Sequence, residues 1–190
     1  MRRCFSIFLL LILIAPLAAA RGPKVKTTYE YYDIGGKSAP DIRKKLNHRG
    51  IRWTDGKVYD AVTKWHVRWN YRYERVDGRC QITSVTTHVD VVIKMPRWTG
   101  QNEADEALKD RWDNYFRALH GHELGHRNFG IKAAAEIERE ISELDPSLDC
   151  AELGAAANAI GHRILDKYRR LEIAYDRETR HGYTEGAVFP

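Results

Sequence analysis

The spacing of the apolar residues changes once along this chain, near residue 102, and the change limits the folds that it can adopt. Before that point, the runs 63–73 (TKWHVRWNYRY) and 81–95 place most of their apolar side chains at odd positions. This alternation is typical of strands with one buried face. From Leu108 to Leu144 the apolar residues instead recur every three or four positions, which predicts helix.

The helical part divides into two long segments. The first stops before Pro146, because a proline disfavours helical backbone at the residue before it. Three glycines between positions 121 and 130 leave open whether this segment is one helix or two. The second segment runs from about Cys150 to a stop at Gly182. Near the N-terminus, residues 25–34 predict a strand and residues 38–47 a short helix.

Strands followed by two helices predict an α+β fold, with a small antiparallel sheet packed against two long C-terminal helices. The two alternating runs predict a hairpin around residues 77–79. A three-residue loop pairs odd positions with odd positions, placing Trp65 beside Val91 and His66 opposite Asp90. We therefore predict three loop residues and this register, with a bulge or the loop glycine supplying the positive φ.

The first residues have the parts of a secretory signal peptide. A basic start (MRR) precedes an apolar run over residues 5–17, and an A-x-A sequence ends at Ala20. The run contains a proline and is shorter than the about 20 apolar residues of a membrane span, so we prefer a cleaved signal to a retained anchor. These features predict a signal peptide over 1–20 and one secreted or periplasmic domain over 21–190, without a stable membrane anchor.

Cys80 and Cys150 are the two cysteines outside the signal peptide. An even pair in an exported chain predicts a disulfide, with two buried free thiols as the alternative. Removing the two arginines of the signal lowers the formal net charge from +5 to +3. This small charge, without a concentrated block of Lys and Arg, argues against a nucleic-acid partner.

The sequence HGHELGH at 120–126 lies within the first helical segment. His122 and His126 are four residues apart, so their side chains leave one face of a helix and can bind one metal ion. His120 is two residues before His122 and points elsewhere. The cluster therefore reduces to HExxH, with two zinc ligands and Glu123 as general base for a zinc-bound water. Surface or capped histidines beside an exposed glutamate are the alternative.

The third ligand has to come from another segment. If the two long helices form a simple antiparallel hairpin, residues 168–176 of the second helix lie level with the motif. Spacing alone therefore nominates Glu172 or Asp176.

HELGH within a long helix, a cysteine on each side of it, and YDRETRHG at 175–182 resemble the bacterial family of predicted secreted zinc-dependent proteases, domain-of-unknown-function family 922. The resemblance extends from YYDIGG at 31–36 through TKWHVRW to the C-terminus. It implies a zincin-like fold with a zinc site. The residues that match the family pattern are His122, Glu123, His126, Asp176, Thr179, His181 and Gly182.

In the light of this resemblance, His181 becomes the favoured third ligand, provided that the helix ends before it and Gly182 turns the chain. Asp176 is the next choice and Glu172 follows. A candidate that does not bind the metal can orient a ligand imidazole. Tyr175 and Tyr183 are candidates for stabilising an oxyanion, with buried aromatic roles as the alternative.

The expected function is zinc-dependent hydrolysis of peptide bonds, with a peptide or protein as the substrate. The edge of the predicted hairpin offers a place where an extended peptide can add as a strand. The first alternative is a catalytically inactive zincin-like protein that binds a partner or has a structural role in the envelope. A disulfide-bonded domain without metal is the second.

Overall fold

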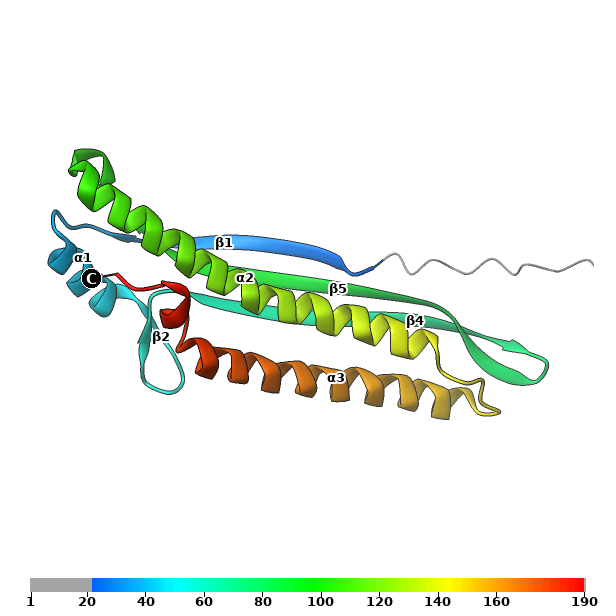
Figure 1. Cartoon of the computed structure of the whole chain (residues 1–190). Helices are drawn as coiled ribbons and strands as arrows, with labels where there is room; N and C mark the ends of the chain where they lie inside the picture. The colour runs from blue at the N-terminus through cyan, green and yellow to red at the C-terminus, as the bar shows by residue number, and fades with distance from the viewer. Residues whose placement is uncertain (1–21, 190) are drawn as a thin grey trace, which may run out of the picture.

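The computed structural model describes residues 22–189, so the predicted signal peptide lies outside the described residues. Figure 1 shows a long, narrow arrangement of strands and two long helices. The elements in chain order are β1 (Lys24–Ile34), α1 (Ala39–Arg49), β2 (Ile51–Arg52), β3 (Val58–Tyr59), β4 (Val62–Val76), β5 (Arg79–Trp98), η1 (Gln101–Glu103), α2 (Glu106–Ser142), α3 (Cys150–Thr179) and η2 (Tyr183–Glu185).

The main sheet has the strand order β1-β5-β4, and the α+β class predicted from the sequence is confirmed. The sheet is mixed rather than wholly antiparallel, because β5 pairs with β4 in antiparallel and with β1 in parallel. A parallel pair needs a long crossover, and α1, the β2–β3 hairpin and β4 together provide it. The short strands β2 and β3 form a separate hairpin.

The predicted register of the long hairpin is confirmed, with Trp65 opposite Val91 and His66 opposite Asp90. The predicted loop length is wrong, because residues 77 and 78 alone connect the strands. Both have positive φ, 49° at Asp77 and 79° at Gly78, as the tight two-residue turns that match strand twist require.

A register shift explains how a two-residue loop and the predicted register coexist. Arg72 pairs with Ser84, whereas the next residue, Tyr73, pairs with Ile82. Thr83 is therefore the extra residue of a β-bulge in β5. Such a bulge changes the pairing by one residue, so odd positions face odd positions beyond it.

The first long helix, α2, is continuous through all three glycines, which answers the question that the sequence left open. Two of these glycines accept aromatic side chains from other elements. A Cβ at Gly130 would lie 2.8 Å from Trp65 Cγ, and a Cβ at Gly125 would lie 2.5 Å from the Tyr175 hydroxyl oxygen. The glycines therefore allow close packing against the helix and do not interrupt it.

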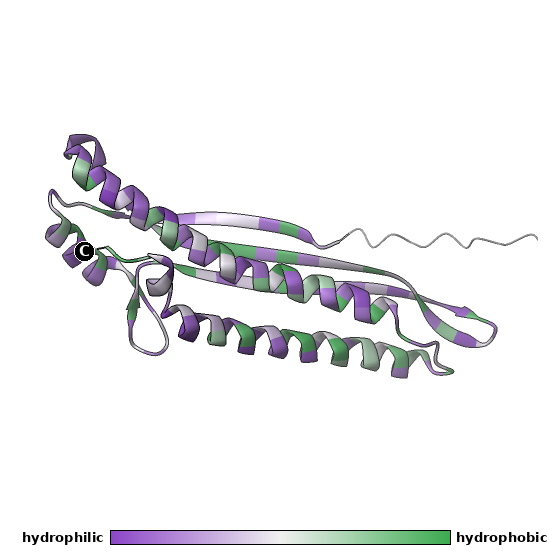
Figure 2. Ribbon diagram, viewed as in Figure 1, coloured by the Kyte–Doolittle hydropathy of each residue, from purple (hydrophilic) through white to green (hydrophobic). Residues whose placement is uncertain are grey.

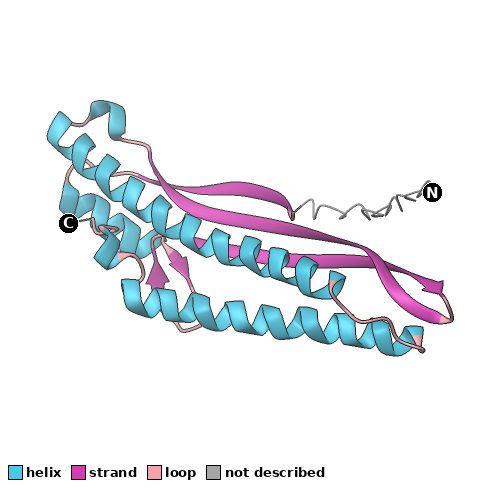
Figure 3. Ribbon diagram, turned by 45° about the vertical axis from the view of Figure 1, so that its right-hand side comes forward, coloured by secondary structure: helices cyan, strands magenta, loops and turns pink. Residues whose placement is uncertain are grey.

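The core lies between the sheet and the helices. Figures 1 and 3 show α2 and α3 running side by side over the same face of the sheet. Figure 2 shows hydrophobic and hydrophilic residues interspersed along α2 and α3, as expected for helices with one buried face. The central strand contributes fully buried side chains to this core, namely Val89, Val91, Ile93 and Met95.

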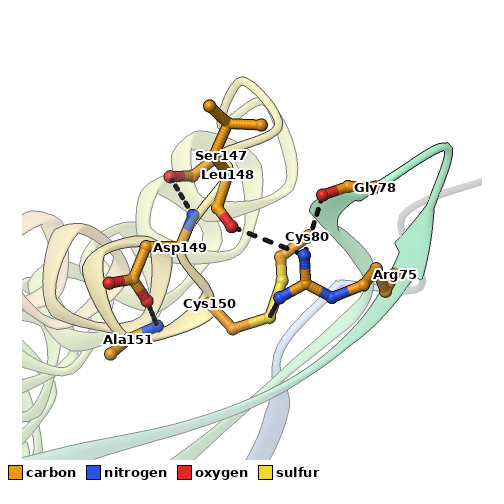
Figure 4. The surroundings of a disulfide bond; sticks show 8 residues. All are labelled: Arg75, Gly78, Cys80, Ser147, Leu148, Asp149, Cys150 and Ala151. Atoms are coloured by element: carbon orange, nitrogen blue, oxygen red, sulfur yellow. Dashed lines mark hydrogen bonds between the residues drawn. A yellow bond between two sulfur atoms is a disulfide. The ribbon is translucent and has the colours of Figure 1, made fainter.

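The predicted disulfide between Cys80 and Cys150 is confirmed, with Cα atoms 5.3 Å apart. It joins the start of β5 to the start of α3. The backbone of Cys80 also exchanges two hydrogen bonds with Ser147 (2.7 and 2.9 Å), so the tip of the long hairpin is fixed to the loop between the helices. Figure 4 shows Arg75 beside this connection, where its guanidinium donates to the carbonyl of Gly78.

Within residues 22–189, no helix combines the length and the apolar character needed to cross a membrane.

Candidate metal centre

The two histidines of the HExxH motif lie on the buried face of α2. His122 and His126 are 3% and 7% exposed, and their Nε2 atoms are 3.1 Å apart. His120 points away from this pair, as predicted, and its Nε2 lies 2.8 Å from the hydroxyl of Tyr29 on β1. The motif thus presents two imidazole nitrogens at one point.

Asp176 on α3 supplies the third donor at that point. Its Oδ1 lies 3.2 Å from His122 Nε2 and 3.0 Å from His126 Nε2. The three donor atoms all lie within 4.8 Å of one another, a spacing at which they could hold a metal ion. The antiparallel arrangement of α2 and α3 brings Asp176 level with the two histidines, as the residue count from the connecting loop predicted.

A further carboxylate contacts each imidazole at Nδ1, the ring nitrogen that faces away from the three donors, and orients the ring. Glu185 Oε2 lies 2.9 Å from His122 Nδ1, and Glu172 Oε1 lies 3.0 Å from His126 Nδ1. The indole of Trp65 donates to Glu172 at 3.1 Å. A neutral imidazole that donates its Nδ1 proton in this way directs its Nε2 lone pair towards the point where the two histidines meet, which is the orientation that a metal ligand needs.

The donor set fits zinc. Two imidazole nitrogens and one carboxylate oxygen are ligands that zinc takes at about 2.0–2.2 Å. In tetrahedral geometry, bonds of that length separate neighbouring ligand atoms by about 3.3 Å, close to the spacings of 3.0 to 3.2 Å observed here. A nitrogen-rich set of this kind suits zinc better than calcium or magnesium, which prefer oxygen ligands.

The electrostatics of the centre favour a positive charge. Burial lowers the pKa of His126, but its hydrogen bonds to Asp176 and Glu172 raise it to about 10. Burial raises the pKa of Asp176, but hydrogen bonds to His122 and His126 hold it well below the usual value. The cluster thus stabilises an added proton or a metal cation between its donors.

Glu123 is close to the centre but is not one of the three donors. It is 3% exposed, and the hydroxyl of Thr63 on β4 donates to its Oε2 at 2.6 Å. Burial raises the pKa of Glu123. A buried carboxylate beside a candidate metal, with a raised pKa, has the properties of a general base.

Tyr175 packs on the ligand imidazoles. Its ring stacks on His122 with centroids 4.9 Å apart, and its hydroxyl donates to Glu185 at 3.0 Å. The absence of a side chain at Gly125 makes room for this hydroxyl. Tyr175 therefore has a packing role at the centre. Tyr183, the other tyrosine considered for oxyanion stabilisation, is 58% exposed.

His181 lies next to the centre, after the end of α3. The backbone turns there through three residues of positive φ, at Arg180, His181 and Gly182. His181 Nδ1 lies 3.2 Å from Asp176 Oδ1, and its ring lies 4.8 Å from the ring of Tyr59. The helix ends before His181 and Gly182 turns the chain, as the ligand prediction required, but the compact donor group consists of His122, His126 and Asp176.

A groove of 1580 Å³ contains the centre. One wall is formed by residues of β4 between Val62 and Trp69. The other is formed by residues of α3 between His162 and Arg177 together with His181, and the β2–β3 hairpin lies at one end. In Figure 3 this hairpin lies close to the C-terminal end of α3. The contact between Tyr59 and His181 joins the hairpin to that end.

Sequence reasoning missed two residues of the centre. Glu185 lies on η2, beyond the predicted end of the second helix, and Thr63 was read only as a strand residue. For Glu185 the sequence offers only Gly182 as the mark of a turn, and the turn also uses positive φ at Arg180 and His181, which the sequence does not indicate. The other candidates, Glu172 and Asp176, are both at the centre.

Comparison with known proteins gives one match. The sequence model of the family described as "Bacterial protein of unknown function (DUF922)" matches residues 29–182, which is most of the chain and includes HExxH, Glu172 and Asp176. No curated protein and no solved structure matches.

Proposed function

Because the chain belongs to the DUF922 family of bacterial proteins, whose function is unknown, we propose from its own residues that it is an exported zinc-dependent metallopeptidase. The signal-peptide pattern and the disulfide between Cys80 and Cys150 support export. The carrying observation is the convergence of His122, His126 and Asp176 at separations of 3.0 to 3.2 Å.

Each ligand imidazole is already fixed from its Nδ1 side, by Glu185 or by Glu172. Such second contacts are a regular feature of metal centres, because they set the tautomer and the direction of the free lone pair. A purely structural pair of buried histidines has no need of separate carboxylates at both Nδ1 atoms and a third carboxylate where the two Nε2 atoms meet.

When bound, zinc supplies a Lewis acid that polarises the substrate carbonyl and lowers the pKa of water. Glu123 is placed to take a proton from the attacking water and to return it to the leaving amine, so that the carbon–nitrogen bond breaks as a carbon–oxygen bond forms. Thr63 holds the carboxylate of Glu123 in one orientation through its hydroxyl.

The groove supports a peptide as the substrate. β4 is an edge strand of the main sheet, and the groove follows it along Val62–Trp69. An extended peptide can form backbone hydrogen bonds with such an edge, which positions its peptide bonds beside the centre.

The test combines metal analysis with turnover. We expect purified residues 21–190 to bind one zinc ion per chain, and His122→Ala to lose it. Glu123→Gln should retain zinc but lose hydrolysis of a peptide library. Absence of stoichiometric zinc in the wild type would refute the metal centre. Zinc without hydrolysis of any peptide would favour the inactive zincin-like alternative.

The same metal analysis assigns the third ligand. We expect Asp176→Ala to lower zinc content as severely as His122→Ala. His181, which the family resemblance favoured, is tested by His181→Ala. Loss of zinc in that variant with retention in Asp176→Ala would assign the third position to His181 instead.

A further inference from the structure

On the basis of the proposed peptidase function, we infer that the groove selects a particular class of extended peptides. On the face of the peptide that meets α3, which carries every second residue, the side chains are alternately apolar and acidic. The juxtaposition of α3 with the outer edge of β4, which pairs with no other strand within residues 22–189, carries this inference.

One side of α3 presents a stripe of alternately aliphatic and basic side chains to the groove. Leu165, Arg169, Ile173 and Arg177 all line it. They are four residues apart, so they lie on one side of the helix with a spacing of about 6 Å. Ile173 is 68% exposed, although it is a large aliphatic residue beside a buried polar centre. An apolar contact from a substrate would remove this surface from water.

The spacing of the stripe matches that of an extended peptide. In a strand, side chains on one face are two residues apart, or about 6.6 Å. β4 and α3 run in opposite directions past each other, since Trp65 bonds to Glu172 and Trp69 bonds to Asn158. A peptide added to β4 therefore lies along α3, and its alternate side chains meet successive members of the stripe.

The charge of the groove favours acidic side chains opposite the arginines. The carboxylates that line the groove away from the centre already have partners. Asp60 forms an ion pair with Arg43, and Asp55 accepts a hydrogen bond from the hydroxyl of Tyr59. Arg169 has an exposed partner, Asp166, at 3.1 Å, a type of pair that contributes little. Lys64 and Arg52 also line the groove and add positive charge.

The position of the centre sets the register. Glu172 and Asp176, which bond to the ligand histidines, flank Ile173 on α3. The substrate residue that faces Ile173 therefore lies beside the bond to be cleaved. Acidic residues two positions before and two positions after it face Arg169 and Arg177.

The test uses three synthetic peptides that share a central leucine and differ only two positions to each side of it, with glutamate, glutamine or lysine there. Binding of labelled peptides to zinc-loaded Glu123→Gln is measured by fluorescence anisotropy, and cleavage by the wild type is measured by mass spectrometry. We expect the glutamate peptide to bind and react about five- to tenfold better than the glutamine peptide, and the lysine peptide to be poorest.

Charge reversal tests whether Arg169 and Arg177 cause the preference for glutamate. Arg169→Glu and Arg177→Glu should shift the preference towards lysine, and Arg169→Gln should remove it in part. Arg170→Glu is the matched control, because Arg170 is exposed on the same helix but does not line the groove. Circular dichroism checks that each variant is folded.

The outcomes separate the inference from the proposed function. Cleavage without a preference for glutamate, or a preference that Arg170→Glu changes as much as Arg169→Glu does, would overturn the inference and leave the peptidase intact. Selective binding of the glutamate peptide without any cleavage would support the groove preference and refute the peptidase.

Discussion

The Thr63 hydroxyl lies 2.6 Å from Oε2 of Glu123, so the edge strand of the sheet directly fixes the candidate general base. Asp60, three residues before Thr63, is in turn held by Arg43 and by the hydroxyl of Tyr115. The start of β4 is thereby anchored on both α1 and α2. A hydrogen bond to a buried carboxylate is worth about 1.5–3 kcal/mol.

Replacing Thr63 by valine keeps the shape of the side chain and removes this hydrogen bond. We expect Thr63→Val to lower turnover about tenfold or more, with zinc content unchanged, because Glu123 loses its orientation but the ligands do not. Thr86→Val on the exposed part of β5 is the control. Equal turnover in the two variants would show that the hydroxyl has no role in the reaction.

Replacing Glu185 by glutamine tests the support of His122. The change weakens the contact to His122 Nδ1, and such outer contacts typically contribute about ten- to hundredfold to metal affinity. Competition with a chelator of known affinity measures the loss. Glu178→Gln, at an exposed position of α3, should leave the affinity unaltered. An unchanged affinity in Glu185→Gln would contradict the assigned role.

Two glycines of α2 should respond oppositely to alanine. A Cβ at Gly125 would lie 2.5 Å from the Tyr175 hydroxyl oxygen, whereas a Cβ at Gly121 would have no neighbour within 4 Å. We expect Gly125→Ala to lower the free energy of unfolding by about 1–3 kcal/mol and to weaken zinc binding. Gly121→Ala should raise that free energy by up to about 1 kcal/mol. Denaturant unfolding measures both, and stabilisation by both would contradict the packing of Tyr175.

The disulfide should contribute to stability without contributing to the metal centre. Cys80 and Cys150 are 70 residues apart in sequence, and closing a loop of that length is worth about 4 kcal/mol. Cys150 lies about 40 Å along α3 from Asp176. We therefore expect the double variant Cys80→Ser, Cys150→Ser to unfold at lower denaturant concentration, with zinc affinity unchanged. A parallel loss of zinc affinity in the folded variant would show that the two ends are coupled.

The parts of the molecule that could be predicted from the sequence depend on local spacing. HExxH has a fixed separation of four residues within a helical pattern, so His122, Glu123 and His126 could be placed on one face without the fold. The register of the long hairpin followed from alternation, because the buried faces of β4 and β5 must coincide. Its loop length did not follow, because the bulge at Thr83 leaves no clear mark in the sequence.

The parts that could not be predicted depend on distant contacts. β1 pairs with β5 in parallel, from Lys24 opposite His88 to Ile34 opposite Trp98. A parallel pair has no connecting turn whose sequence could indicate it. Glu185 reaches His122 only because the chain reverses after α3. The choice between Asp176 and His181 as a ligand depends on side-chain directions at the end of that helix, which periodicity does not contain.

The residues that follow α3 also determine when the centre can form. Glu185 supports His122, and Phe189 is buried in the core a few residues later. Both residues leave the ribosome after HExxH, because they follow it in the sequence. A partly synthesised chain that stops before them therefore contains HExxH in an incomplete setting, and the centre is finished only when these later residues have folded back onto α2 and the core.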